Sequence, residues 1–161
     1  MKRFLLLFAM AAPLFCTAQL KSSLVCNMYV DVLAGTVNGV EPDYLPAQVK
    51  KNLPCFTSEE AETASSPCGG VIHYRDNDIY FYTGKDYIEI KENFKGKLSI
   101  PLMGAARENT FASLGNPKLR DVNWDAFQTQ YGTLILYYGA SGRVNKIQFS
   151  SKPSEILTIC N

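Results

Sequence analysis

The stretch from Gly69 to Lys91 constrains the fold most strongly. It alternates apolar and polar residues and is rich in aromatic and β-branched types, a pattern typical of strands. Turn-forming residues interrupt it at Asp76-Asn77 and again at Gly84-Lys85. The pattern therefore predicts three strands joined as an antiparallel meander.

The alternation also predicts which side chains share a face, because successive side chains of a strand point to opposite sides of the sheet. One face is expected to carry Ile79, Phe81, Ile88 and Ile90, and the other Tyr80, Tyr82, Tyr87 and Glu89. The first set predicts a core surface. The second predicts a surface lined by tyrosines.

The N-terminal segment has the pattern of a secretory signal peptide. Two basic residues precede an apolar run, residues 4–15, which is too short to span a bilayer, and small residues follow up to Ala18. We expect cleavage after Ala18. The alternative is a lipoprotein signal with Cys16 as the lipidated residue, but Phe15 stands where the lipoprotein peptidase requires a small residue.

Residues 19–161 then form the mature chain, whose length suits one domain, with halves at 19–97 and 98–161. The full chain has 16 basic and 15 acidic side chains, so the loss of Lys2 and Arg3 leaves a net charge of about −1. This balance argues against nucleic acid or an anionic membrane as the partner. No later segment is apolar enough to predict a membrane span, and we expect a periplasmic or secreted protein.

Four cysteines remain in the mature chain: Cys26, Cys55, Cys68 and Cys160. An even number in an exported protein predicts two disulfides, with three possible connectivities. Cys55 and Cys68 flank a polar loop, so we expect them to pair and Cys26 to pair with Cys160. A metal or redox role has less support, because the chain has no CxxC motif and His73 is its only histidine.

Helical signals appear once in each half. Apolar residues recur at helical spacing between Asp43, a candidate N-cap or first-turn acid, and Pro54. In the second half, residues 105–114 predict a helix that stops at Gly115. We interpret residues 118–131, which include Trp124, as a loop or irregular helix.

Strand signals end each half. Residues 133–138 and 143–149 predict a hairpin around a glycine-containing turn, and Ile156, Leu157 and Ile159 predict an edge strand before Cys160. Each half thus runs from a short helix through a loop to an aromatic hairpin, which suggests a tandem duplication. We predict an α+β fold with one antiparallel sheet, short helices packed on one face and two disulfides.

The second half contains RENTFASLGNP and, further on, YGTLILYYGASGRVNKIQF. Across residues 102–149 it resembles the small exported helix-plus-hairpin domains of the outer-membrane-assembly lipoprotein family and of the β-lactamase-inhibitor protein family. The resemblance implies a protein that presents a sheet face and loops to another protein. The chain departs from the assembly family because it lacks a suitable lipidation cysteine, and the matching positions are turn and core residues, so no functional residue is carried over.

Catalytic patterns are weak. His73 lies in a predicted strand without a G-x-S-x-G elbow, and we interpret Asp76-Asn77-Asp78 as a hairpin turn rather than a calcium loop. A hydrolase would need two of the scattered acids close together, and these are Glu41, Glu89, Glu92, Asp121 and Asp125. We therefore predict no catalytic residue, no metal and no cofactor.

The tyrosines are more informative, because tyrosine and tryptophan are enriched at protein interfaces. The candidate binding face consists of Tyr80, Tyr82, Tyr87, Trp124 and Tyr137, with Tyr138 as the alternative in the second hairpin. Ordinary strand composition, with the rings covered by residues 118–131, is the competing interpretation. We expect a non-enzymatic protein-binding module, inhibitor-like or immunity-like. The alternatives are an envelope-assembly or structural factor and, third, a hydrolase.

Overall fold

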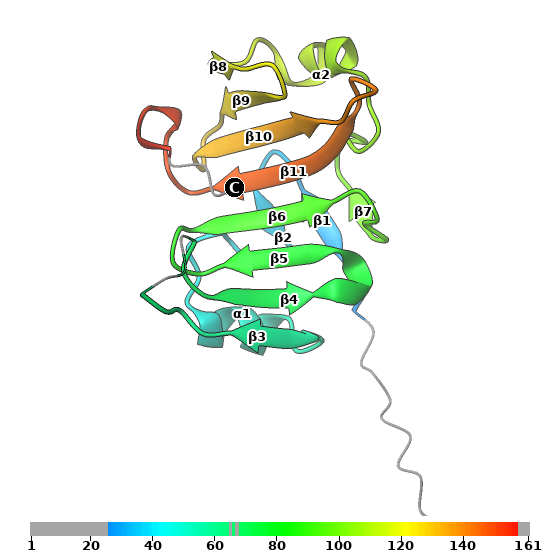
Figure 1. Ribbon diagram of the computed structural model, residues 1–161. Helices are drawn as coiled ribbons and strands as arrows, with labels where there is room; N and C mark the ends of the chain where they lie inside the picture. Colours follow the sequence, from blue (N-terminus) through cyan, green and yellow to red (C-terminus); the bar gives the residue numbers. More distant parts are fainter. Residues whose placement is uncertain (1–25, 65, 67, 158–161) are drawn as a thin grey trace, which may run out of the picture.

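An eight-stranded antiparallel sheet dominates the computed structural model, which describes residues 26–64, 66 and 68–157 (Figure 1). In spatial order its strands are β3 (Ser58–Glu60), β4 (Val71–Tyr74), β5 (Ile79–Tyr82), β6 (Tyr87–Lys91), β11 (Val144–Ser150), β10 (Thr133–Tyr138), β9 (Trp124–Gln128) and β8 (Leu119–Arg120). Each half of the chain contributes a four-stranded meander, and the last strands of the two meanders, β6 and β11, pair at the centre of the sheet. The predicted α+β fold is confirmed.

The predicted meander of residues 69–91 is present as β4, β5 and β6. Its first turn is a short 3₁₀ helix, η1 (Arg75–Asn77), which ends at Asp78 with a φ of 56°, the left-handed conformation that Asp and Asn tolerate. The turn interpretation of Asp76-Asn77-Asp78 is therefore confirmed. The second hairpin, β10 and β11, also forms where the sequence predicts it.

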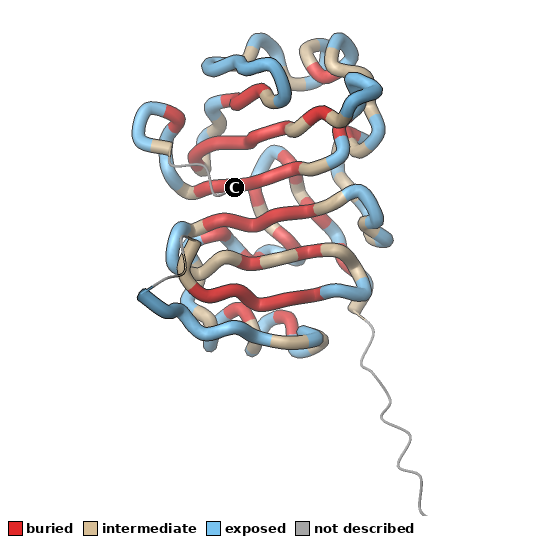
Figure 2. The backbone as a smooth tube through the Cα atoms, in the orientation of Figure 1, coloured by how far each residue is buried: buried red, intermediate tan, exposed pale blue. Residues whose placement is uncertain are grey.

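The core lies against one face of this sheet. Ile79 pairs with Ile90 and Phe81 pairs with Ile88, as the alternation predicts, and all four side chains are buried. The same apolar surface continues across the central pair to Ile147 and Phe149 of β11 and then to β10. Figure 2 shows the resulting band of buried residues along the middle strands.

A second, three-stranded sheet covers this face, and the sequence does not predict it. Its order is β2 (Thr36–Val37), β1 (Tyr29–Asp31) and β7 (Lys97–Leu98), with β1 and β7 parallel. Figure 1 shows β1 and β2 lying behind the large sheet. Val30, Val32 and Val37 point into the shared core and are fully buried.

Helix α1 (Pro46–Asn52) begins later than the sequence suggests. Its N-cap is Leu45, whose backbone N–H donates to the Gln48 side-chain oxygen at 2.9 Å, and Pro46 occupies the first helical position. The prediction of Asp43 as the N-cap is therefore wrong, because the proline sets the start of the helix. The predicted stop before Pro54 is confirmed, since Leu53 is the C-cap.

Helix α2 (Arg107–Leu114) ends at Gly115, whose φ of 78° suits a glycine C-cap. Phe111 and Leu114 pack against the same core as Val49 and Leu53 from α1. Both helices thus lie on one face of the large sheet, as predicted. The N-cap is Ala106, so the helix begins two residues later than the predicted start at residue 105.

Three strands lie where the sequence suggests loops. Residues 118–131 contain β8 and β9 rather than a loop or irregular helix, and the polar loop between Cys55 and Cys68 contains β3. Strand β9 has the sequence WDAFQ, and its charged Asp125 occupies a core-facing position. The strand therefore lacks the alternation of apolar and polar residues by which a strand is recognised in a sequence. The prediction fails there because a tertiary ion pair makes an aspartate acceptable in the core.

Asp125 is fully buried and anchors α2 to the sheet. Arg107 donates from Nε to Oδ2 at 2.9 Å and from Nη2 to Oδ1 at 2.6 Å, a bidentate geometry that strengthens the pair. The Tyr138 hydroxyl donates to Oδ2 at 2.8 Å, and the Arg107 guanidinium lies 4.8 Å from the Tyr138 ring centroid. Arg120 approaches the same carboxylate at 3.6 Å.

The cysteine pairing differs from the prediction, because Cys26 is bonded to Cys55. Strand β3 lies between Cys55 and Cys68 in the sequence and places them beyond opposite ends of the β3–β4 pair. Cys68 is also disulfide-bonded, and its partner lies outside the described residues. Cys160, Cys16 and the expected signal peptide also lie outside them.

The tail does not form the predicted edge strand at Ile156, because Ser154–Ile156 are a 3₁₀ helix, η2. Ile159 lies outside the described residues. Among the residues that the structure describes, no helix is long and apolar enough to cross a membrane.

We predict that peptide mapping without reduction will find Cys26 joined to Cys55 and Cys68 joined to Cys160. The first bond follows from the structure, and the second follows from counting, because these two cysteines remain once the predicted cleavage after Ala18 removes Cys16. Mass spectrometry of the digest before and after reduction measures both. A Cys55–Cys68 peptide, or a free thiol at Cys68, would contradict the pairing.

We predict that Arg107→Ala lowers the free energy of unfolding by about 3 kcal/mol, because it leaves the buried Asp125 carboxylate without its bidentate cation. Urea denaturation followed by Trp124 fluorescence measures the change. The control is Lys118→Ala, which removes a surface cation at a 4.0 Å ion pair and should change the free energy by less than about 0.5 kcal/mol. Equal effects of the two substitutions would refute the anchoring role.

Candidate functional site

The face of the large sheet opposite the two helices and the small sheet, which we term the open face, carries the candidate site. Cross-strand register places its residues in three rows. The middle row crosses all eight strands as Ser58, His73, Tyr80, Glu89, Gln148, Ile135, Ala126 and Leu119. One outer row is Lys91, Lys146, Tyr137 and Trp124, and the other is Glu60, Val71, Tyr82, Tyr87, Ser150, Thr133 and Gln128.

The predicted binding residues all point to this face. Tyr80, Tyr82, Tyr137 and Trp124 are half-buried there. Trp124 is a strand residue next to Tyr137, so residues 118–131 extend the sheet instead of covering the tyrosines. Tyr138, the alternative to Tyr137, points into the core.

Tyr87 shares the face but is only 2% exposed. It forms a small cluster with Ala126 and Ile135, against which Tyr82, Trp124, Tyr137 and Leu157 pack. Leu157 reaches this cluster from the C-terminal segment. Tyr87 is therefore a packing residue of the open face, and its ring offers little area to a partner.

A charged group, which we term the central cluster, lies in the middle of the open face. The Glu89 side chain is 6% exposed, and its two carboxylate oxygens lie 3.3 Å from Lys91 Nζ and 3.4 Å from Lys146 Nζ. Gln148 Nε2 donates to the same carboxylate at 2.7 Å, and its Oε1 accepts from the Tyr137 hydroxyl at 2.7 Å. A buried carboxylate is tolerated when it is paired and hydrogen-bonded, as here.

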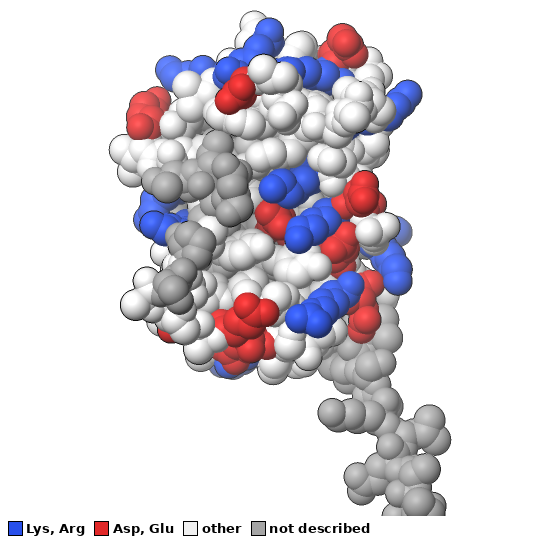
Figure 3. All heavy atoms as spheres, in the orientation of Figure 1, with Lys and Arg blue, Asp and Glu red and all other residues white. Residues whose placement is uncertain are grey.

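The tyrosine rings hold the two lysines in place. Lys91 Nζ lies 4.3 Å from the ring centroid of Tyr80, and Lys146 Nζ lies 3.9 Å from that of Tyr137. Such cation–π contacts are worth about 0.5–1 kcal/mol at partly exposed sites. Figure 3 views this face and shows charges of both signs over the end of β6 and the start of β11, beside an uncharged surface.

The phenols of this face are held in the protonated form. Burial raises the pKa of Tyr82 to about 12, and the negative charge of Glu89 acts in the same direction. Burial raises the pKa of Tyr87 to about 12. The pKa of Tyr137 is raised by burial and then by the neighbouring Tyr87 and Glu89, and that of Tyr80 by burial and then by its hydrogen bond to Asp78. These hydroxyls therefore act as hydrogen-bond donors at neutral pH.

His73 lies on the same face at the edge of the aromatic group, and it is buried. Its Nε2 lies 3.0 Å from Glu60 Oε1, which is within ion-pair distance, but the geometry is not that of a hydrogen bond. The His73 ring packs edge-to-face against the ring of Tyr80. Within the described part of the chain, Ser58 Oγ and both His73 nitrogens have no hydrogen-bond partner. Ser58 and His73 therefore do not form the hydrogen-bonded nucleophile–base pair that acyl transfer requires.

Two of the scattered acids, Glu89 and Asp125, lie on opposite sides of the large sheet. Glu89 faces the open side of the sheet, whereas Asp125 lies on the core side and is paired with Arg107. Asp78 accepts hydrogen bonds from the Tyr80 hydroxyl and the Asn93 backbone N–H, so its carboxylate links the end of the η1 turn to the segment that follows β6. Among residues 26–64, 66 and 68–157, no three His, Cys, Asp or Glu side chains are arranged to hold a metal ion.

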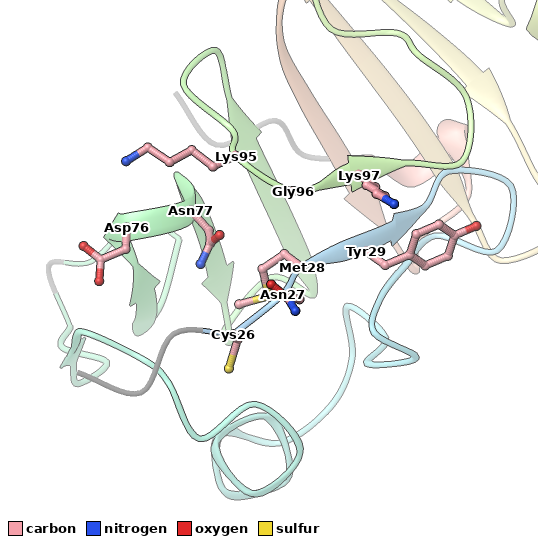
Figure 4. A pocket seen from close by; sticks show the side chains of 9 residues that line it. All are labelled: Cys26, Asn27, Met28, Tyr29, Asp76, Asn77, Lys95, Gly96 and Lys97. Atoms are coloured by element: carbon pink, nitrogen blue, oxygen red, sulfur yellow. The ribbon is translucent and has the colours of Figure 1, made fainter. Parts of the chain in front are cut away.

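A hollow of about 730 Å³ lies at the start of β1, away from the central cluster (Figure 4). It is lined by Cys26, Asn27, Met28, Tyr29, Asp76, Asn77, Lys95, Gly96 and Lys97. Figure 4 shows that Lys95 and Lys97 point in opposite directions. Its charged groups do not converge on one ligand position, so we do not place the functional site there.

The sequence pattern placed the aromatic residues on one face but gave no place there to Lys91, Lys146 and Gln148. A signal was present, because IEIK and KIQF each place one polar residue between two large apolar residues of a central strand. Only the register of β6 against β11 shows that Glu89 and Gln148 face each other, with the two lysines beside them.

Comparisons of the chain with protein-family models, with curated proteins and with solved structures found no match.

We predict that the protein loses stability as the pH rises from about 10 to about 12. Unfolded tyrosine has a pKa near 10, whereas Tyr82, Tyr87 and Tyr138 have pKa values of about 12 in the fold. In this range the unfolded chain releases protons that the folded chain keeps, so the free energy of unfolding falls with pH. The stability contributed by these protonated tyrosines is fully retained below pH 10.

Urea midpoints from pH 8 to pH 12, with phenolate absorbance recorded in parallel, measure this loss. Phenolate formation centred near pH 10 for all tyrosines, with no loss of stability above it, would contradict the prediction.

Proposed function

We propose that this chain is an exported, non-enzymatic binding module that recognises another protein with its open face. The observation that carries the proposal is the group of half-exposed rings, Tyr80, Tyr82, Tyr137 and Trp124, on a sheet face that neither helix covers. Aromatic side chains of this kind supply large, rigid contact areas with a polar tip, and such residues dominate interface energetics.

Pre-organisation supports the proposal. Tyr80 and Tyr137 are each fixed by a hydroxyl hydrogen bond and by a lysine over the ring. Binding then orders few additional side chains, so less free energy is lost to conformational entropy when the complex forms. A surface that is rigid before binding suits an inhibitor-like or immunity-like protein. This agrees with what the resemblance to the β-lactamase-inhibitor protein family implies.

The test is site-specific photo-crosslinking in the cells that produce the protein. A benzophenone amino acid replaces Tyr82 or Tyr137 in separate variants, and it replaces Leu45 in the control. Leu45 is 67% exposed and caps α1, on the opposite side of the sheet. We expect irradiation to join the same partner protein to both open-face positions and not to position 45.

The crosslinked partner then allows a quantitative measurement. Tyr82→Ala combined with Tyr137→Ala should keep the far-ultraviolet circular dichroism spectrum and cost about 2 kcal/mol or more of binding free energy, roughly a 30-fold rise in Kd. Tyr29→Ala is the matched control, because Tyr29 is 46% exposed and lies in the small sheet. Absence of adducts at the open face, or identical adducts from position 45, would refute the proposal.

A further inference from the structure

The central cluster contains more positive charge than its own fold requires. Lys91 and Lys146 occupy directly opposite positions on β6 and β11, and both side chains point to the open face. Like charges opposite one another in an antiparallel pair are destabilising. One carboxylate, Glu89, serves both lysines, so the cluster keeps a net charge of about +1.

The excess charge is accessible. The Lys91 and Lys146 side chains are 42% and 26% exposed, whereas the Glu89 carboxylate between them is buried and also accepts a hydrogen bond from Gln148. Each ammonium has three N–H donors; one direction serves Glu89, and a second faces the ring of Tyr80 or Tyr137. Within the described residues, Glu89 is the ion-pair partner of both lysines, which leaves one donor direction on each ammonium for a second anion.

The surroundings make the pair selective for a single anionic group beside an apolar surface. Tyr80 and Tyr137 hold the ammonium groups at 4.3 and 3.9 Å from the ring centroids, and Trp124 lies next to Tyr137 on β9. A partner that covers these rings excludes water from the lysines, which strengthens their attraction for a negative charge. Lysine binds such a charge as a point donor rather than through a bidentate geometry.

We propose that the open face recognises a carboxylate of its protein partner, an aspartate or glutamate side chain that lies between the Lys91 and Lys146 ammonium groups. This inference rests on the proposed function, since it names the partner chemistry of the same face. A protein carboxylate fits better than nucleic acid or an anionic lipid surface, because the site has a net charge near +1 and the whole chain is close to neutral.

The experiment selects peptides from a random displayed library on the immobilised full-length mature protein. The binding affinity of the enriched peptides is then measured for two variants. The first is Glu89→Gln, and the second combines Glu89→Gln with Lys91→Gln and Lys146→Gln. The Glu89→Gln background avoids leaving a buried carboxylate without its cations, so loss of binding cannot be attributed to an unpaired Glu89. Circular dichroism and urea midpoints verify that each variant is folded.

We expect the enriched peptides to contain Asp or Glu next to an aromatic or large apolar residue. Glu89→Gln should tighten their binding several-fold, because it removes the competing anion. Adding the two lysine substitutions should then weaken binding by about 10-fold or more, the scale of a lost charge-assisted hydrogen bond. The control, Lys118→Gln with Lys152→Gln, removes two lysines that pair with Glu155 and Asp86 elsewhere and should leave binding unchanged.

Three other outcomes would contradict the carboxylate inference, the proposed function or both. Peptides that need Tyr82 and Tyr137 but contain no acid, or that bind the lysine-free variant equally well, would overturn the carboxylate inference and leave the proposed function intact. Lysine-dependent binding to phosphatidylglycerol vesicles in place of acidic peptides would replace the protein carboxylate with a lipid phosphate. Failure to select any peptide that depends on open-face residues would overturn both proposals.

Discussion

The antiparallel pairing of β6 with β11 is the interaction on which the rest of the structure depends. It joins the two meanders into one sheet and leaves only the short β3 and β8 as edges, which limits the exposed backbone that could pair with other chains. Ile88 and Ile90 meet Ile147 and Phe149 on its core side. On its other side Glu89 faces Gln148, so the same strand pair also forms the floor of the candidate site.

The sheet contains one buried carboxylate on each face, and the two are neutralised differently. Asp125 is held by the bidentate guanidinium of Arg107, a rigid arrangement that anchors α2. Glu89 is held by two lysines whose ammonium groups remain partly exposed. The first is a structural ion pair within the protein, and the second leaves a cation accessible to an external ligand. This contrast places the candidate function on the open face.

Prediction from the sequence succeeded where the signal is local. The alternation of residues 79–90 correctly assigned both faces of β5 and β6, and Gly115 marked the end of α2. It failed where a distant partner decides the outcome. Strand β9 was missed because Asp125 is neutralised by Arg107, and the parallel β1–β7 contact joins segments separated by most of the first half. The pattern also placed the candidate aromatic residues on one face, but it did not predict the lysines and the glutamine that lie among them.

The sequence by itself determined the fold class, the strand faces and the tyrosine-rich surface, because period-two alternation and turn residues act within a few positions of the chain. Only the tertiary structure decided the Cys26–Cys55 bond, the second sheet and the meeting of Glu89 with Lys91 and Lys146. These features depend on the register between strands far apart in sequence. Residues more than 50 positions apart become neighbours there, and no local pattern records which of them will face each other.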